Sequence, residues 1–234
     1  MVTNNLILPS GVSKLDRLLN GGIHTGLFTH IYGEAASGKT TLALQFVSAA
    51  VKLGIHSIYV NSEGSSPIER FQQISGHSIS DVSNLVQIFS PKDFDEQGGL
   101  IENLELYARK DTRLIVMDTL TRLYRIMLED RSSTYVAHRE LNRQTGFLKG
   151  LAKERDVAII ILNQVRSTMK GIDEVEPVAG NILDYWSDYV IHMRPKKQQG
   201  ERLLKRIAPK GEASEVVLHL TSSGFSTERP HEKQ

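Results

Sequence analysis

The stretch GEAASGKT, from Gly33 to Thr40, restricts the possible folds of this chain more than any other part of its sequence. Its two glycines, followed by a lysine and a threonine, match the pattern G-x-x-x-x-G-K-[ST]. The apolar run at 27–33 predicts a buried strand before it, and the apolar spacing of 40–54 predicts a helix after it, ending at Gly54. A glycine-rich turn between a strand and a helix indicates an α/β protein with a phosphate-binding loop, the P-loop.

The residue types of this loop suit a nucleoside triphosphate and a metal ion. Glycines allow successive backbone N–H groups to point at a phosphate, and the helix adds the partial positive charge of its N-terminus. Lys39 would contact the β- and γ-phosphates, and Thr40 would bind Mg²⁺. The alternative is a turn that contains Lys-Thr by chance, but the pattern and its flanking elements agree independently. We expect ATP and Mg²⁺ as ligands, with nucleotide contacts from Gly33, Glu34, Ala35, Ala36, Ser37, Gly38, Lys39, Thr40 and Thr41.

Strand and helix patterns alternate through the middle of the chain. Apolar runs predict strands at 56–63, 113–119 and 157–165, and helical spacing predicts helices at 99–111 and 140–156. Strands that are apolar on both faces are typical of a mostly parallel sheet flanked by helices.

The pattern changes after Arg166. Residues 167–181 are polar, contain glycine and proline, and are expected to form a long loop. Further strands are predicted at 189–195 and 201–207, around the tip KKQQG, and as a last pair in 215–225. We expect one domain over residues 1–234, with a core at about 10–225, a C-terminal antiparallel hairpin extension and a disordered tail at 226–234.

Composition narrows the function classes only slightly. The chain has 28 Lys and Arg against 27 Asp and Glu, so its net charge does not indicate nucleic acid, and a basic surface must be local. Cysteine is absent, which excludes disulfides and thiolate metal sites. The N-terminus lacks the features of a signal peptide, and no apolar stretch approaches the roughly 18–20 residues that span a bilayer. A soluble, cytoplasmic protein without a membrane partner is therefore expected.

Three polar side chains end predicted strands and are candidates for the chemistry. Asp118 closes LIVMD, where a carboxylate would complete the Mg²⁺ site with Thr40, although it could instead cap the next helix. Glu63 closes SIYVNSE and would polarise a water for attack on the γ-phosphate, unless it is a capping or solvated glutamate. Gln164 ends the strand before the long loop and would contact the γ-phosphate, or simply bond to backbone.

The region 192–210 concentrates basic side chains. Seven Lys and Arg stand against one acid, Glu201, which suits a phosphate backbone. A solvated charged face is the alternative interpretation. The residues that we predict to contact DNA from this region are Arg194, Lys196 and Lys197.

Four segments resemble one known family. GVSKLDRLLNGGIHTGLFTHIYGEAASGKTTLALQ, YVNSEGSSPIER, LIVMDTLTRLYR and VAIIILNQV, in this order, are similar to the ATPase core of RecA-type recombinases, most closely the archaeal RadA and eukaryotic branch. The resemblance covers roughly residues 10–225. It implies a RecA-like P-loop NTPase core, ATP hydrolysis with Mg²⁺, and a role in DNA recombination and repair.

The resemblance also implies residue roles. Glu63, in SEG, matches the catalytic glutamate of the family, and Gln164, in NQV, matches its γ-phosphate sensor. Arg70, in IER, matches an arginine that stacks on adenine. The segment after Leu128 and the loop 167–181 occupy the positions of two DNA-binding loops, so Arg131, Arg166 and Lys170 are further candidates for DNA contacts.

The chain departs from the family pattern in three places. We expect it to lack the N-terminal DNA-binding domain and the Phe-containing peptide through which recombinase subunits join. The second DNA loop is shorter and lacks a phenylalanine, and the SEG-SSP stretch lacks a Phe-Arg pair. These differences indicate a weakly hydrolysing accessory paralogue that binds DNA with low specificity, acts with the main RadA-type recombinase and stays a monomer or small oligomer. A regulatory ATP-binding module and a clock-type or helicase-type ATPase of the same fold are the alternatives.

Overall fold

A computed structural model of the chain describes residues 5–129, 134–167, 175–211 and 214–229. Its main feature is a ten-stranded sheet with the order β12-β11-β10-β9-β3-β7-β6-β4-β5, in which β8 pairs with β7 outside this path. The strands are β3 Phe28–Gly33, β4 His56–Asn61, β5 Val86–Phe89, β6 Thr112–Asp118, β7 Ala158–Ser167, β8 Val175–Pro177, β9 Tyr189–Pro195, β10 Glu201–Ala208, β11 Glu215–Thr221 and β12 Gly224–Ser226. Two short strands, β1 Ile7–Leu8 and β2 Ile23–His24, form a separate antiparallel pair.

The central strands are parallel, as the apolar runs predict. In β3, β4 and the last five residues of β6 every residue is buried, because helices cover both faces of this part of the sheet. Pairing aligns the carboxyl ends of the strands, with Gly33 opposite Gln164 and Asn61 opposite Asp118. The predicted site residues that end these strands therefore meet at one edge of the sheet.

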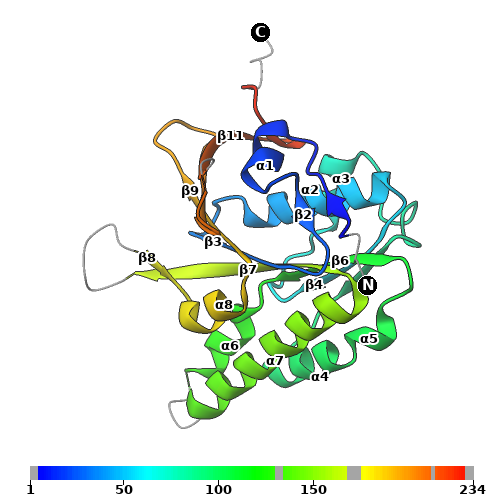
Figure 1. Cartoon of the computed structure of the whole chain (residues 1–234), viewed down its shortest axis with the longest axis vertical. Helices are drawn as coiled ribbons and strands as arrows, with labels where there is room; N and C mark the ends of the chain where they lie inside the picture. Colours follow the sequence, from blue (N-terminus) through cyan, green and yellow to red (C-terminus); the bar gives the residue numbers. More distant parts are fainter. Residues whose placement is uncertain (1–4, 130–133, 168–174, 212–213, 230–234) are drawn as a thin grey trace.

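The C-terminal extension is antiparallel from β9 to β12, in agreement with the predicted hairpins. β9 itself is parallel to β3, with Gly33 opposite Met193, so the extension joins the core beside the P-loop strand. In Figure 1 these strands curve toward the face of the sheet that carries α2 (Lys39–Lys52).

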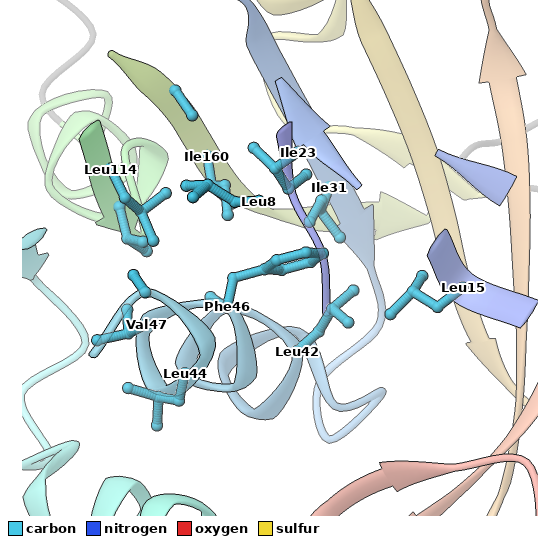
Figure 2. Packing of buried hydrophobic residues seen from close by; sticks show 14 of the residues in the cluster. Leu8, Leu15, Ile23, Ile31, Leu42, Leu44, Phe46, Val47, Leu114 and Ile160 are labelled. Atoms are coloured by element: carbon cyan, nitrogen blue, oxygen red, sulfur yellow. The ribbon is translucent and has the colours of Figure 1, made fainter. Parts of the chain in front are cut away.

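Helices form a layer on each face of the sheet (Figure 1). One layer contains α1 Ser13–Leu18, α2 and α3 Ile68–Ser75, and the other contains α4 Phe94–Glu102, α5 Leu104–Tyr107, α6 Thr121–Met127, α7 Thr134–Arg155 and α8 Gly180–Trp186. Each layer has its own apolar core against the sheet. In the first, the ring of Phe46 points from α2 toward Leu8, Ile23 and Ile31 (Figure 2).

Two predicted helices have different boundaries in the structure. The helix predicted at 99–111 begins at Phe94, where Asp93 caps it by accepting the Glu96 N–H, and it ends at Glu102 before the short helix α5. A Cβ on Gly98 would lie 2.7 Å from Glu140 of α7, so close helix packing explains a glycine inside α4. Helix α7 starts at Thr134, six residues before the predicted start.

The loop predicted at 167–181 is only partly a loop. β8 pairs with β7, and α8 begins at Gly180, while residues 168–174 lie outside the described part of the chain. The tail predicted at 226–234 is described only to residue 229, and β12 ends at Ser226. Among the residues that the structure describes, no helix is both long and apolar enough to cross a membrane.

Candidate nucleotide-binding site

The P-loop connects β3 to α2, and its two glycines are required by close contacts. A Cβ on Gly33 would lie 2.1 Å from the Met193 carbonyl oxygen of β9. Gly38 caps α2 with φ of 100°, and a Cβ there would lie 2.8 Å from Cζ of Phe225 on β12. The extension strands thus pack directly against the loop and hold its shape.

The side chain of Lys39 turns back into the P-loop, which precedes it in the sequence. Its ammonium group donates hydrogen bonds to the carbonyl oxygens of Gly33 and Glu34, at 2.9 and 2.8 Å. The residue is only 8% exposed. Burial lowers the pKa of Lys39, while the negative charges of Asp118, Glu63 and Glu34 oppose that shift. The loop carbonyl oxygens thus hold the Lys39 ammonium in the P-loop, where the predicted phosphate would lie next to it.

Thr40 and Asp118 come together, as the sequence predicts. The Thr40 hydroxyl donates to Oδ2 of Asp118 at 2.8 Å, and the buried Tyr59 hydroxyl donates to the same oxygen at 2.5 Å. Burial raises the pKa of Asp118, and the hydrogen bonds from Tyr59 and Thr40 counteract the rise. A hydroxyl and a carboxylate side by side at a phosphate loop are the oxygen ligands that Mg²⁺ prefers, so these residues fit the predicted ion.

Glu63 and Gln164 also lie together, although they are 101 positions apart. The Gln164 side-chain nitrogen donates to Oε1 of Glu63 at 3.0 Å. Its side-chain oxygen accepts a hydrogen bond from Arg125 of α6 at 2.6 Å. Both Glu63 and Gln164 are half-buried. The predicted base and the predicted phosphate sensor therefore contact each other directly.

The backbone around Glu63 is tied to the neighbouring strand. Ser62 N–H donates to the Asp118 carbonyl oxygen at 2.7 Å, and the Thr119 N–H donates to the Ser62 hydroxyl oxygen at 3.1 Å. Arg122 of α6 donates to the Ser62 carbonyl oxygen at 2.7 Å. These bonds fix the segment that carries Glu63 relative to Asp118.

Arg70 has several partners. Its guanidinium donates to the Thr41 hydroxyl at 3.2 Å and to the carbonyl oxygens of Thr221 and Ser222, at 2.8 and 2.7 Å. It therefore links α3 to the start of α2 and to the β11–β12 turn. Its stacking on adenine stays a prediction.

The predicted DNA-contacting residues are separated in the structure. Arg131 and Lys170 lie outside the described residues. Arg166 is exposed, with its guanidinium 3.8 Å from Glu176, and Arg194 and Lys197 are exposed. Lys196 lies 3.5 Å from the Glu201 carboxylate.

Two basic residues of the same region point elsewhere. Arg206 is buried and donates to the Leu18 carbonyl oxygen at 2.8 Å, and Arg202 donates to the Ala36 carbonyl oxygen of the P-loop at 3.3 Å. The basic concentration in 192–210 is therefore not a single surface: Arg202 and Arg206, four positions apart on β10, share the face that packs against the P-loop and α1, whereas Lys205 between them is exposed.

Sequence reasoning missed Tyr59, Arg122 and Arg125 as neighbours of the site. Tyr59 lies in a buried strand, where its pattern indicates core packing only. The two arginines follow Asp118 at helical spacing, and that spacing was the one available signal that both could face the site.

Comparisons with known proteins identify relatives over nearly the whole chain. The family model described as Rad51 matches residues 3–228. A DNA repair and recombination protein RadB from Methanococcoides burtonii is 36% identical over 215 residues, which are 90% of this chain and 94% of that protein. Its counterpart from Methanosphaera stadtmanae is 34% identical over 229 residues, covering 96% and 97% of the two chains. A crystal structure of the RadB recombinase superposes with a TM-score of 0.79 at 28% identity, covering 95% of this chain and all of that one.

Proposed function

Because the chain belongs to the Rad51 family, we propose that it is an ATP-binding, weakly hydrolysing accessory protein of DNA recombination and repair. Its relatives are named as RadB proteins of DNA repair and recombination. The observation that carries the nucleotide part is the group formed by Lys39, Thr40 and Asp118 at the P-loop. This group combines a buried cation for phosphate with two oxygen ligands for a divalent ion.

Each residue of the site has one task in this proposal. The P-loop N–H groups and Lys39 bind the phosphates of ATP, and Thr40 and Asp118 hold Mg²⁺, which neutralises phosphate charge when bound. Glu63 accepts a proton from the attacking water, and Gln164 binds the γ-phosphate. Tyr59 keeps the Asp118 carboxylate oriented from the side of the core.

Slow hydrolysis is supported by the contact between Glu63 and Gln164. One carboxylate oxygen of Glu63 already accepts a hydrogen bond from Gln164 at 3.0 Å. This bond occupies one of the acceptor sites of the carboxylate and competes there with the attacking water, which is expected to slow hydrolysis.

The DNA part of the proposal rests on the exposed cations. Arg166, Arg194 and Lys197 are exposed, and Arg166 lies in β7 and Arg194 in β9, the two strands that flank the P-loop strand β3. Contacts of this kind bind phosphate backbones without reading sequence. We propose that the protein binds single- or double-stranded DNA in this way, works with the main RadA-type recombinase and remains a monomer or small oligomer.

A comparison of Lys39→Ala with Glu63→Gln tests the nucleotide part. Lys39→Ala is expected to weaken ATP binding, because it removes the phosphate-facing charge. Glu63→Gln is expected to keep ATP affinity within about twofold and to reduce turnover by roughly 10²–10⁴, the range for a general base. Calorimetry measures binding, and phosphate release measures turnover.

Two outcomes would contradict this assignment. Equal loss of binding in both variants would show that Glu63 is structural. Tight ATP binding by the wild type with no turnover above that of Glu63→Gln would favour a regulatory ATP-binding module. Lys52→Ala, at the far end of α2, is the matched control for loss of a lysine.

A further inference from the structure

We propose that Arg125 is a positioning residue that fixes the orientation of the Gln164 side-chain amide, and that it acts on ATP hydrolysis only through Gln164. The proposal rests on the ATPase function proposed above. It starts from the chain of contacts in which Arg125 donates to Gln164 at 2.6 Å and Gln164 donates to Glu63 at 3.0 Å.

The chemistry of the two neighbours gives the Gln164 amide one favourable orientation. A guanidinium has donors and no acceptor, and an ionised carboxylate has acceptors and no donor. Between them the amide must present its oxygen to Arg125 and its nitrogen to Glu63. A flipped amide would place N–H against N–H and oxygen against oxygen, losing both hydrogen bonds.

Helix α6 holds Arg125 in place through other contacts with the same strand ends. Arg122, one turn earlier, donates to the Ser62 carbonyl oxygen at 2.7 Å. The buried Thr121 hydroxyl donates to the Asn163 side-chain oxygen at 2.6 Å, next to Gln164 in β7. The first turn of α6 is thereby fixed to β4 and β7, and Arg125 extends from the following turn to the Gln164 side chain.

The fixed orientation matters when ATP binds. Phosphate oxygens, like a carboxylate, accept hydrogen bonds, so Gln164 must offer its nitrogen to either partner. With its oxygen held by Arg125, the nitrogen can exchange from Glu63 to the γ-phosphate without a flip of the amide. The exchange releases the Glu63 oxygen for a water at the same time.

A solvated surface arginine is the competing interpretation, because Arg125 is exposed. That interpretation predicts no effect on the Gln164 amide. The contact distance of 2.6 Å, on a helix whose first turn is fixed to β4 and β7, favours a persistent bond instead.

The first measurement uses the ligand-free protein. In nitrogen-15 NMR spectra, the Gln164 side-chain amide is assigned from the Gln164→Ala spectrum. Arg125→Ala is expected to shift or broaden this signal, and Arg125→Lys to restore it in part, because lysine retains a donor. Arg113→Ala is the matched control, since Arg113 lies at the opposite end of β6 and donates to the carbonyl oxygens of Lys110 and Thr112. An unchanged Gln164 signal in Arg125→Ala would overturn the proposal.

The second measurement is a double-mutant cycle in turnover. Arg125→Ala is expected to lower kcat about 3- to 10-fold and to leave KM for ATP within about twofold. This range is smaller than that of a buried hydrogen bond to a charged group, because Arg125 is exposed to solvent. In the Gln164→Ala background the same substitution should change kcat less than about twofold. An equal loss in both backgrounds would show that Arg125 acts elsewhere.

The experiment separates this proposal from the proposed function. Failure of the wild type to bind ATP would refute the nucleotide function, while the ligand-free spectra would still decide the Arg125 contact. If turnover is too slow to measure, the Gln164 signal decides the proposal with and without ATP. The NMR signal of the Gln164 side-chain amide must shift when ATP binds to the wild type, and the shift must be different in Arg125→Ala. An identical shift in both proteins would overturn the proposal.

Discussion

Tyr59→Phe isolates the hydroxyl that donates a hydrogen bond to the Asp118 carboxylate. Tyr59 is 1% exposed in the middle of β4, and its hydroxyl donates to Oδ2 of the 3% exposed Asp118. The substitution removes one oxygen atom and leaves the ring packing unchanged. Among the described residues, Asp118 then keeps only the Thr40 hydroxyl as a donor to that oxygen.

The expected loss follows from the kind of bond removed. A hydrogen bond to a charged group contributes about 1.5–3 kcal/mol, and removal of the buried tyrosine hydroxyl recovers part of its own desolvation cost. We expect Tyr59→Phe to lower the free energy of unfolding by about 1–2 kcal/mol. For a chain of this size, that corresponds to a melting temperature lower by roughly 2–8 °C.

The pH dependence of this loss has a defined sign. Burial raises the pKa of Asp118 from its ordinary value of 3.8, and the Tyr59 bond is one of the contacts that lower it. A raised carboxyl pKa stabilises the fold at low pH, and this contribution is lost as pH rises from 3.8 through the folded pKa. Tyr59→Phe raises that pKa further, so its cost should be larger near pH 7 than near pH 4.

Urea unfolding of the ligand-free protein at several pH values measures the effect. Tyr107→Phe is the control, because Tyr107 is exposed and no hydrogen bond of its hydroxyl occurs within the described residues. An unchanged or increased stability of Tyr59→Phe at neutral pH would refute the assignment of a supporting bond. A loss that is the same at all pH values would show that the hydroxyl acts on packing and not on the carboxylate.

Three further predictions test other parts of the structure. Gly38→Ala should lower the free energy of unfolding by about 2–3 kcal/mol in urea, because φ is 100° and the new Cβ meets Phe225, whereas Gly54→Ala has open space and should cost only about 1 kcal/mol. Arg206→Ala should lower the free energy of unfolding by about 2–4 kcal/mol, because the buried guanidinium donates to the Leu18 carbonyl oxygen and the Asn20 side chain. Its DNA affinity should be unchanged, and a variant with native stability and weaker DNA binding would reverse this interpretation. Lys197→Ala should reduce the slope of log K for DNA binding against log salt by about 0.7–0.9, and Lys196→Ala should reduce it by less, because Glu201 lies beside Lys196. Equal slopes in the wild type and both variants would show that the hairpin tip does not contact DNA.

The fold could be predicted from the sequence wherever a local pattern carried enough information. Apolar runs identified β3, β4, β6 and β7, and the antiparallel hairpins at 189–225 were recognised from strand-like runs around polar tips. The helix predicted at 99–111 was wrong at its start, because Gly98 and Gly99 obscured a helix whose cap, Asp93, and first-turn acids were present in the sequence. Gly98 packs closely against Glu140 and Gln144 of α7, which no local pattern reports, whereas Gly99 has open space around it.

The basic region shows the same limit for function. Composition places seven cations between residues 192 and 210, and a charge count treats them alike. The pleat of β10 turns Arg206 into the core and Arg202 toward the P-loop, while Lys197 stays exposed at the tip. Which cations are free to contact DNA depends on strand pairing, and strand pairing is a property of the folded sheet.

The sequence by itself determined the P-loop, the residues that end each central strand and the family. These depend on residue type and spacing within short segments. Only the tertiary structure decided that Tyr59 supports Asp118, that Arg70 holds the β11–β12 turn and that Arg125 contacts Gln164. The reason is physical: the bonded residues are 39 to 152 positions apart in these pairs, and periodicity shows which face a residue occupies, not which distant donor meets its acceptor.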